Sequence, residues 1–237
     1  MTELGNILAV ILARGGSKGI PGKNLKLVGG ISLVGRAARF ASSLQMVTKT
    51  VISSDDDTII KEAVKFGAEA PFQRPAELSS DTALSVDAWR HAWLTSEEHY
   101  GIRIETSLLF EPTSPLREAD DVTKVLEALQ VPNVLSATTV SKIPSHFAPP
   151  KVFSRTQSGM LQSMAQDPEK SSIRQSLNSY YNRNGLVYAA RRQAIVELRS
   201  IVGSHCAGIT TERSVVNIDT LQDLSEAEAL IRSRGMI

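Results

Sequence analysis

A glycine-rich, basic segment near the start of the chain has the composition of a phosphate-binding loop. It reads LARGGSKGIPGKN over residues 12–24 and follows an apolar run, residues 7–12, that is typical of a buried strand. Glycine lets a backbone approach a ligand closely, and Arg14, Lys18 and Lys23 add positive charge at the same turn. A strand that ends in such a loop is how α/β folds hold a polyphosphate, whereas an ordinary surface loop has little use for so many glycines and cations.

The spacing of this loop excludes the two commonest phosphate-binding motifs. A Walker loop reads G-x-x-x-x-G-K-[ST], but Gly19 and Gly22 do not stand in that relation to Lys23, and Asn24 replaces the hydroxyl residue. The dinucleotide fingerprint G-x-G-x-x-G is also absent. We therefore expect the loop to hold a polyphosphate in another way.

Residues 14–18 (RGGSK) and 21–24 (PGKN) resemble the signature loop of the nucleotide-sugar pyrophosphorylases and, in detail, that of the N-acylneuraminate cytidylyltransferases, also called CMP-sialic acid synthetases. Four later segments match the same family, and the matches together span the chain: 74–85, 109–117, 172–188 and 215–220. The resemblance implies a Rossmann-like three-layer α/β/α nucleotidyltransferase fold. It also implies a reaction in which CTP and an acidic nine-carbon keto sugar give a CMP-sugar and pyrophosphate.

The resemblance further implies a set of nucleotide-binding residues in the first two segments. They are Arg14, Gly15, Gly16, Ser17, Lys18, Asn24, Arg74, Ala83 and Ser85. Small side chains at positions 83 and 85 would let backbone groups hydrogen-bond the base closely. Arg14 and Lys23 would face the triphosphate and, with Arg174, are the residues that we expect to be catalytic. The sequence offers no nucleophile–base pair, so no covalent intermediate is expected.

Glu111, Arg174 and Asn184 match positions that face the acidic sugar in the family. Glutamine is usual where this chain has Glu111, and an amide can donate a hydrogen bond where an ionised carboxylate only accepts one. The guanidinium of Arg174 suits bidentate recognition of a carboxylate. The family's second arginine is Asn182 here, and the neighbouring Arg183 would replace it only if the backbone turned suitably.

Residues 217–219 match the family's Asp-Ile-Asp pattern, in which alternating carboxylates point the same way from a strand end and suit Mg²⁺. This chain has Asn217 and Asp219, so one of the two ligands brings no charge. The glutamate at 111 and the asparagine at 217 together conserve the formal charge of the family pattern, and we hypothesise that they compensate each other. The acidic turn at 55–57 is expected to cap a helix rather than bind a metal, and the four histidines have no metal-binding spacing.

Strand-like and helix-like patterns alternate along most of the chain, which indicates βαβ units and a mainly parallel sheet. Strands are predicted over residues 7–12, 49–53, 69–72, 106–110, 133–140, 185–190 and 214–218. Helices are predicted over residues 33–44, 58–66, 82–93, 119–129 and 221–232. Asp81 is the expected N-cap of the third helix and Thr220 that of the last. Ligands of such sheets bind at the carboxyl ends of the strands, where the basic loop, Asp55 and Glu111 fall.

Residues 141–183 break this alternation. The segment holds four prolines and no long helical pattern, but apolar residues around two expected short strands, 151–154 and 160–164, argue against disorder. We expect a single domain over residues 1–237, from which this segment projects as an arm that buries its apolar residues on another subunit. The corresponding arm in the family completes the partner's active site, so the resemblance implies a homodimer in which the arm serves dimerisation and sugar binding.

The bulk composition is that of an ordinary soluble globule, with 237 residues, 42% hydrophobic residues and a net charge of +1. This balance favours neither nucleic acid nor a membrane as a partner, and no apolar run is long enough to span a bilayer. Cys206 is the only cysteine, which excludes an intrachain disulfide, and the start of the chain has no signal-peptide pattern. A cytoplasmic protein is the simplest expectation.

Two alternatives stay open at this point. The enzyme could use another base or a different acidic keto sugar, such as legionaminic, pseudaminic or deaminated sialic acid, because Glu111 and Asn182 fall where the sugar would be chosen. The chain could instead be a nucleotide-binding homologue with impaired catalysis. Asn217 favours that interpretation, and the retained Arg14 and Asp219 argue against it.

Overall fold

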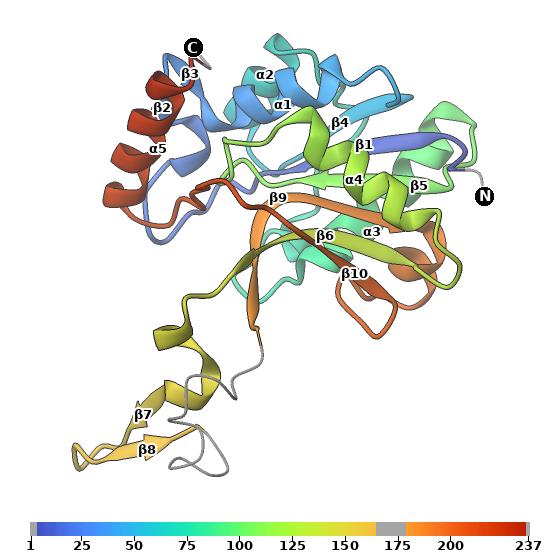
Figure 1. Cartoon of the computed structure of the whole chain (residues 1–237). Coiled ribbons are helices and arrows are strands. Elements are labelled where there is room, and N and C mark those ends of the chain that lie inside the picture. Colours follow the sequence, from blue (N-terminus) through green and yellow to red (C-terminus); the bar gives the residue numbers. More distant parts are fainter. Residues whose placement is uncertain (1–3, 165–178, 236–237) are drawn as a thin grey trace.

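The computed structural model describes residues 4–164 and 179–235. Within these residues the core is a six-stranded sheet in the order β10-β6-β9-β5-β1-β4 (Figure 1). Its strands are β1 (Ile7–Leu12), β4 (Lys49–Ser53), β5 (Thr106–Phe110), β6 (Ser136–Lys142), β9 (Tyr181–Arg191) and β10 (Cys206–Thr210). β1 pairs in parallel with β4 and β5, and β10 with β6, whereas β9 runs antiparallel between β5 and β6. The predicted α/β fold with a mainly parallel sheet is confirmed.

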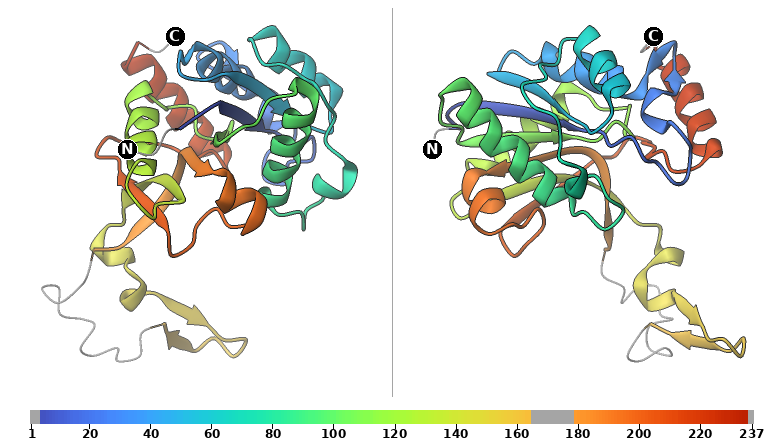
Figure 2. Two further views of the ribbon diagram at one scale, coloured as in Figure 1. Left: turned by 90° about the vertical axis from the view of Figure 1, so that its right-hand side faces the viewer. Right: turned by 180° about the vertical axis from the view of Figure 1, so that it is seen from behind.

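Helices cover both faces of the sheet and complete a three-layer α/β/α arrangement (Figure 2). On one face pack α1 (Leu33–Ser43), α2 (Asp57–Lys65) and α4 (Ala119–Leu129). On the other face packs α3 (Ser85–Tyr100), whose Trp89 and Trp93 are fully buried against the strands. Residues of β1 alternate between the two layers, so the strand is apolar throughout, as its sequence indicated.

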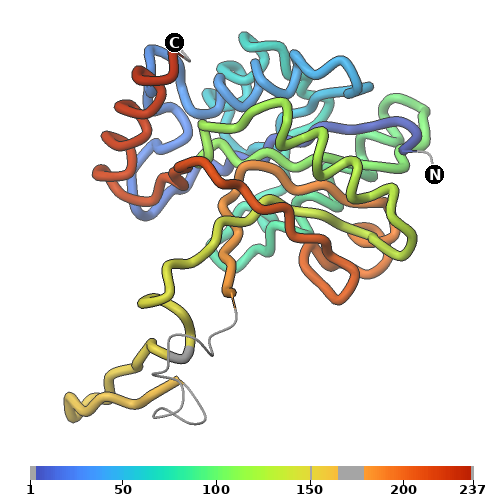
Figure 3. The backbone as a smooth tube through the Cα atoms, viewed as in Figure 1, coloured from blue at the N-terminus to red at the C-terminus, as the bar shows by residue number. Residues whose placement is uncertain are grey.

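A smaller apolar cluster carries the C-terminal helix. α5 (Leu221–Ser233) packs through Ala227 and Ile231 beside the hairpin of β2 (Leu27–Val28) and β3 (Ile31–Ser32). The predicted cap Thr220 begins α5 in a capping box with Asp223. Between β10 and α5 the chain crosses the molecule to reach the basic loop (Figure 3). This crossing brings the C-terminal segment to the carboxyl end of β1.

The chain that follows β6, up to residue 164, leaves the body of the molecule as an arm (Figure 1). Its described part contains two short 3-10 helices, η3 (Ser145–Phe147) and η4 (Pro149–Lys151). They are followed by a hairpin of β7 (Phe153–Arg155) and β8 (Leu161–Ser163). The two short strands that the sequence predicted are therefore present, each shorter than its predicted range.

Two predicted strands are absent, and the strands β2, β3 and β10 were not predicted. Residues 214–218 are extended but pair with no strand of the described sheet. Val216 and Ile218 are buried and alternate with the exposed Asn217, so an extended segment produced the period of two that suggested a strand. The edge strand is instead β10, whose sequence CAGIT has too few apolar residues to stand out. Residues 69–72 likewise supply only an isolated bridge to β4.

The third helix begins later than predicted. It starts at Ser85, extends to Tyr100 beyond the predicted range of 82–93, and has Leu84 rather than Asp81 as its N-cap. Asp81 pairs instead with two cations of the basic loop, which takes it away from the capping position. The other predicted helices begin and end within one residue of their observed limits. Among the described residues, none of the helices has the length and apolar character that crossing a bilayer requires.

Candidate active site

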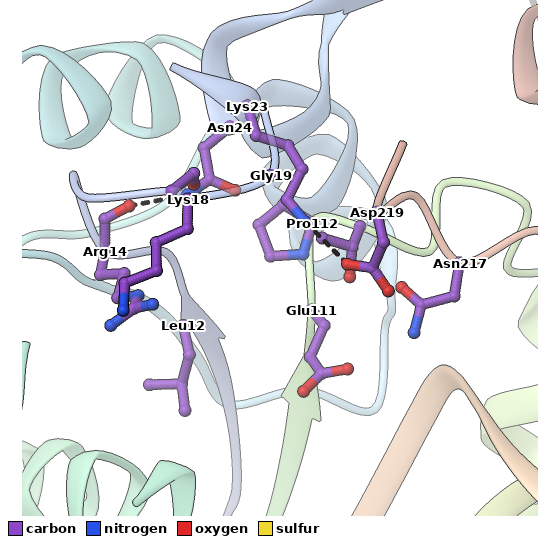
Figure 4. Close-up of a pocket in the computed structure, with 12 residues that line it drawn as sticks. Leu12, Arg14, Lys18, Gly19, Lys23, Asn24, Glu111, Pro112, Asn217 and Asp219 are labelled. Atoms are coloured by element: carbon purple, nitrogen blue, oxygen red, sulfur yellow. Dashed lines mark hydrogen bonds and ion pairs between the residues drawn. The ribbon is translucent and has the colours of Figure 1, made fainter. Parts of the chain in front are cut away.

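Two adjoining cavities open at the carboxyl ends of β1 and β5. The larger has a volume of about 420 Å³ and is lined by the basic loop, by Glu111 and by Asn217 and Asp219 (Figure 4). The smaller has a volume of about 290 Å³ and is lined by the segment that leads into α3. Arg14 and Glu111 line both cavities, which are therefore neighbouring parts of one cleft.

Lys23 joins the basic loop to the segment that carries Asp219. Its ammonium donates to the Ile218 carbonyl oxygen at 2.8 Å and pairs with Asp219 Oδ1 at 3.0 Å. The Lys23 side chain is only 14% exposed, whereas the Asp219 side chain is 75% exposed. The ammonium is thus fixed by the main chain, while the carboxylate remains accessible to a second partner.

Glycines allow this close approach. Gly22 has φ +63° and precedes the single turn η1 (Lys23–Leu25), so a left-handed residue directs Lys23 back toward the cavity. A Cβ on Gly19 would lie 2.7 Å from the carbonyl oxygen of Asp219. Because a real Cβ does not come that close to a backbone atom, only glycine lets the loop and the C-terminal segment meet here.

Two side chains fix the first turn of the loop. Asp55, which follows β4, accepts a hydrogen bond from the Gly15 N–H at 2.9 Å. Asn24 is 7% exposed and donates from Nδ2 to the Arg14 carbonyl oxygen at 2.9 Å, while its side chain also lines the larger cavity. The acidic turn therefore supports the loop in addition to its predicted capping role, in which Asp56 caps α2.

Arg14 and Lys18 share one carboxylate. Arg14 donates from Nη1 to the Ser80 carbonyl oxygen at 2.8 Å and pairs from Nη2 with Asp81 Oδ1 at 3.1 Å. Lys18 pairs with Asp81 Oδ2 at 2.9 Å. The hydrogen bond from Lys18 and the two positive charges hold the pKa of Asp81 below its ordinary value. Both cations therefore pair with the segment that lines the smaller cavity.

The smaller cavity has small residues on its wall and a buried cation beside them. Ala83 and Ser85 line it, at the positions where the resemblance placed the base. Arg74 also lines it, is 6% exposed, and donates to both the hydroxyl and the carbonyl oxygen of Ser53. Burial lowers the pKa of Arg74 to about 10, so the side chain stays charged at neutral pH.

Glu111 lies where the two cavities meet. Burial raises the pKa of its carboxyl group, against the opposing effect of the positive charges on Arg183 and Arg117. Arg117 is 3% exposed and donates to the main-chain oxygens of Leu186, at 3.0 Å, and of Glu111 itself, at 2.5 Å. Its guanidinium lies 5.4 Å from the centre of the Phe110 ring. Arg117 thus ties the backbone of Glu111 to β9.

Asn217 and Asp219 face the larger cavity, as alternate residues of an extended segment should. The segment is held at the end of β5 by a hydrogen bond from the Ile218 N–H to the Thr113 carbonyl oxygen at 2.8 Å. Figure 4 shows Arg14 on the opposite side of the cavity from both residues. The alternation that predicted the pair is therefore correct, although no strand carries it.

The oxygen atoms on this side of the cavity fit a magnesium ion that is also bound by substrate. The described residues contain no cluster of three or more His, Cys, Asp or Glu side chains that would hold a metal by themselves. The accessible carboxylate of Asp219, the amide oxygen of Asn217 and the nearby Glu111 supply a few oxygens. Mg²⁺ needs no more, because it keeps waters and takes phosphate oxygens as ligands.

An irregularity in β9 shapes the side of the cleft next to Glu111. The pairing of β9 with β6 shifts so that residues 184–187 stand opposite a single residue, and Gly185 has φ +74° at this bulge. The exposed Arg183 has its guanidinium 5.9 Å from the centre of the Tyr188 ring and acts electrostatically on Glu111. Arg183 thus lies near Glu111, although it lines neither cavity.

Asn184 faces the bulge rather than either cavity. It is 4% exposed, and its Oδ1 accepts from the Thr139 hydroxyl at 2.6 Å. Its Nδ2 donates to the Ser141 hydroxyl at 3.1 Å. Because both ends of the amide make hydrogen bonds inside the protein, Asn184 fixes the bulge, and it lines neither of the two cavities.

The family model described as Cytidylyltransferase matches residues 8–234. The chain belongs to the cytidylyltransferase family. The matched range begins in β1 and ends after α5, so it includes the basic loop, the arm and the segment with Asp219. The chain is a nucleotidyltransferase, as the sequence resemblance implied.

Among the similar proteins, two that match nearly the whole chain come from Campylobacter jejuni. The CMP-N,N'-diacetyllegionaminic acid synthase is 28% identical over 234 residues and covers 98% of each chain. The pseudaminic acid cytidylyltransferase is 30% identical over 228 residues and covers 95% of this chain and 96% of its own. These relatives confirm the predicted family of sialic-acid-like CMP synthetases.

A solved structure supports the fold class. It is that of a CMP:2-keto-3-deoxy-manno-octonic acid synthetase complexed with CTP, and its TM-score is 0.71 at 18% identity. The match covers 97% of this chain and 99% of that one.

The structure brings most predicted site residues to one cleft. Arg174, predicted to be catalytic, lies outside the described residues, and Asn184 faces the bulge. Three groups were not predicted at the site: Asp81, which lines the smaller cavity, and Arg117 and Tyr188, which contact Glu111. All three lie in segments that match the family, Asp81 in 74–85, Arg117 at the end of 109–117 and Tyr188 at the end of 172–188, but their spacing indicated no role at the site.

Replacing Gly185 with alanine is expected to disturb the side of the cleft around Glu111. A Cβ there would lie 2.5 Å from Ser114 Oγ, 3.1 Å from Glu111 Oε2 and 3.4 Å from Asn217 Nδ2. We expect kcat/KM for the sugar to fall by about 10- to 100-fold, as small misplacements of reacting groups do. The positive φ should also lower the free energy of unfolding by about 1–3 kcal/mol. Gly101→Ala is the matched control, because φ is +63° there and nothing lies near its Cβ, so equal turnover in the two variants would contradict the prediction.

Proposed function

We propose that the protein transfers the cytidylate of CTP to an acidic nonulosonic sugar. The observation that carries this proposal is one cleft in which a basic loop faces Asp219 and which continues into a cavity of about 290 Å³ lined by Ala83 and Ser85. A nucleotide with its base in the smaller cavity would place its phosphates along Arg14 and Lys23. The two Campylobacter relatives, named for legionaminic and pseudaminic acid, support a sugar of this class.

In the proposed reaction the anomeric hydroxyl of the sugar attacks the α-phosphorus of CTP. The new bond joins the sugar oxygen to phosphorus, the bond to the bridging oxygen of the β-phosphate breaks, and pyrophosphate leaves while the hydroxyl proton passes to solvent. Negative charge grows on the phosphoryl oxygens and on the leaving group. Lys23, whose ammonium is fixed by the Ile218 carbonyl oxygen, and Arg14 would stabilise this charge most strongly in the transition state.

Mg²⁺ is the cofactor that we assign to this reaction. Asp219 and Asn217 would hold it, with Glu111 close by, and phosphate oxygens and waters would complete its ligands. When bound, the ion would neutralise charge on the phosphates. The pairing of Lys23 with Asp219 supports this assignment, because it keeps the carboxylate at the wall of the cavity before substrate binds.

Glu111 and Arg183 are the described side chains that we propose for the sugar. They lie close enough for the charge of Arg183 to oppose the rise that burial causes in the pKa of Glu111, so a sugar with both a carboxylate and donor groups could use the two together. A guanidinium suits the carboxylate, and a carboxylate accepts from hydroxyl or amide donors. Arg174 remains the proposed second cation for the sugar.

Pyrophosphate release from CTP across a panel of acidic keto sugars tests this function. The panel contains sialic, deaminated sialic, N,N'-diacetyllegionaminic and pseudaminic acids. We expect release with at least one sugar and none when the sugar is omitted. Equal release with UTP or ATP would favour another nucleotide specificity, and CTP binding without release from any sugar would favour the impaired homologue. Absence of CTP binding would overturn the proposal.

The proposal includes a homodimer assembled through the arm. Phe153 and Leu161 lie on one face of the β7–β8 hairpin, because Phe153 pairs with Ser163 and Arg155 with Leu161. The two apolar side chains are 52% and 70% exposed. Several exposed apolar residues on a projecting arm are typical of a surface that another chain covers. A cytoplasmic location also belongs to the proposal and accords with the single, unpaired Cys206.

Replacing Leu161 with arginine is expected to give a monomer, because a charge would be buried without a partner at the proposed interface. Light scattering should give twice the mass of one chain for the natural protein and the mass of one chain for the variant. Gln162→Arg places the same charge on the opposite face of the hairpin and should stay dimeric. A natural protein that is monomeric and fully active would contradict the proposed assembly.

A further inference from the structure

One carboxylate pairs with two cations of the basic loop. Asp81 presents one oxygen to Arg14 Nη2 at 3.1 Å and the other to Lys18 Nζ at 2.9 Å. The remaining terminal nitrogen of Arg14 donates to the Ser80 carbonyl oxygen at 2.8 Å. Two anionic oxygens spread over a guanidinium and an ammonium are what a phosphate group would offer at the same place.

This carboxylate has no structural task that would account for its position. Asp81 does not cap α3, since Leu84 holds that position, and its side chain is 50% exposed. Among residues 4–164 and 179–235, it makes no hydrogen bond or ion pair other than those with Arg14 and Lys18. The contact therefore joins the basic loop to the segment before α3 without contributing to the cap of that helix.

The segment that carries Asp81 also forms a wall of the smaller cavity. Residues 79–84 connect η2 (Ala76–Leu78) to α3, and Ser80, Asp81 and Ala83 line that cavity. A single contact thus connects the cations of the basic loop with the wall of the cavity proposed for the base. Displacement of Asp81 from Arg14 and Lys18 would free the two cations for a ligand.

We infer that Asp81 is an autoinhibitory placeholder that the triphosphate of the nucleotide displaces from Arg14 and Lys18. The inference rests on the proposed function of the cleft. A ligand that needs the two cations binds only the fraction of molecules in which Asp81 has left them, and its apparent affinity is reduced by that fraction. A ligand that uses only the smaller cavity avoids this cost.

The exposure of the two ion pairs of Asp81 determines how much phosphate affinity should increase when they are removed. Ion pairs between exposed side chains are weak and are screened by salt. Removing two such pairs should therefore tighten phosphate binding by about 2- to 10-fold. The gain should shrink at high ionic strength, because screening weakens the competing ion pairs in the natural protein.

Calorimetric binding to Asp81→Asn tests the inference with three probes: CTP, inorganic tripolyphosphate and cytidine. We expect the variant to bind CTP and tripolyphosphate about 2- to 10-fold more tightly than the natural protein and to bind cytidine equally. Glu77→Gln removes the same charge from η2, where Glu77 is exposed, and should leave all three affinities unchanged. In a Lys18→Met background the gain from Asp81→Asn should be smaller, because one of the two pairs is already absent.

The outcomes separate this inference from the proposed function. If the natural protein binds CTP but Asp81→Asn binds it no more tightly, or binds cytidine more tightly by the same factor, the placeholder role is wrong while the nucleotide site stands. An equal gain in Glu77→Gln would assign the effect to general charge and would also overturn the role. If the natural protein binds neither CTP nor tripolyphosphate, both conclusions fail.

Discussion

Lys23→Met is expected to lower kcat/KM for CTP by about 10²- to 10³-fold, the loss typical of removing one group that stabilises developing charge. The natural ammonium is held by the Ile218 carbonyl oxygen at 2.8 Å and by Asp219 at 3.0 Å, with its side chain only 14% exposed. Methionine keeps the apolar stem but supplies no donor. Initial rates of pyrophosphate release at saturating sugar measure the effect.

Lys26→Met is the matched control for this prediction. Lys26 lies three residues further along the same loop, is exposed, and lines neither cavity, so its replacement changes the net charge equally without touching the site. We expect its kcat/KM to stay within about 2-fold of the natural value, as for surface substitutions away from special features. Similar losses in the two variants, or normal turnover in Lys23→Met, would contradict the assignment of Lys23 to the phosphates.

The parts of the site that sequence reasoning placed correctly carry local signals. β1 was predicted at its observed limits because both its faces are buried and the strand is apolar at every position. The turn after it was predicted because glycine is needed where the chain is left-handed, as at Gly22, and where backbones meet, as at Gly19 and Asp219. Asn217 and Asp219 were paired correctly because alternation survives in any extended segment.

The parts that were missed depend on contacts between distant segments. By local propensity Asp81 is a helix cap, but ion pairs with Arg14 and Lys18, more than 60 positions earlier in the chain, determine where its side chain lies. Asn184 carried the family's sugar-binding pattern, yet the bulge in β9 uses both ends of its amide. Neither a bulge nor an ion pair between loops leaves a periodic trace in the sequence, so neither was predictable from spacing.

The chain differs from the family pattern at 111, where it has Glu for Gln, and at 217, where it has Asn for Asp. The structure provides a physical basis for the hypothesis that these two differences compensate each other. Glu111 Oε2 and Asn217 Nδ2 lie 3.1 Å and 3.4 Å from one point, the position of a Cβ on Gly185. Both side chains also line the larger cavity next to Asp219. A negative charge moved from 217 to 111 therefore stays at the same wall of the cleft, where the proposed Mg²⁺ and the sugar would meet.

A double-mutant cycle of Glu111→Gln and Asn217→Asp tests this compensation. Glu111→Gln removes a charge from the wall and Asn217→Asp adds one beside an existing carboxylate, so each change alone should lower kcat/KM by about 10-fold. The double variant restores the charge and should recover most of the loss, which corresponds to a coupling energy of about 2 kcal/mol or more.

The Mg²⁺ concentration that gives half-maximal rate, and direct Mn²⁺ binding followed by electron paramagnetic resonance, should show the same pattern as the rates. Glu111→Gln combined with Asn133→Asp is the control cycle, because Asn133 lines neither cavity, has φ +67°, and aspartate tolerates that left-handed conformation. The control pair should be additive. If the Glu111 and Asn217 pair is strictly additive as well, the two side chains act independently. The charge at 111 would then not compensate for the charge missing at 217, although the two side chains lie close together at Gly185.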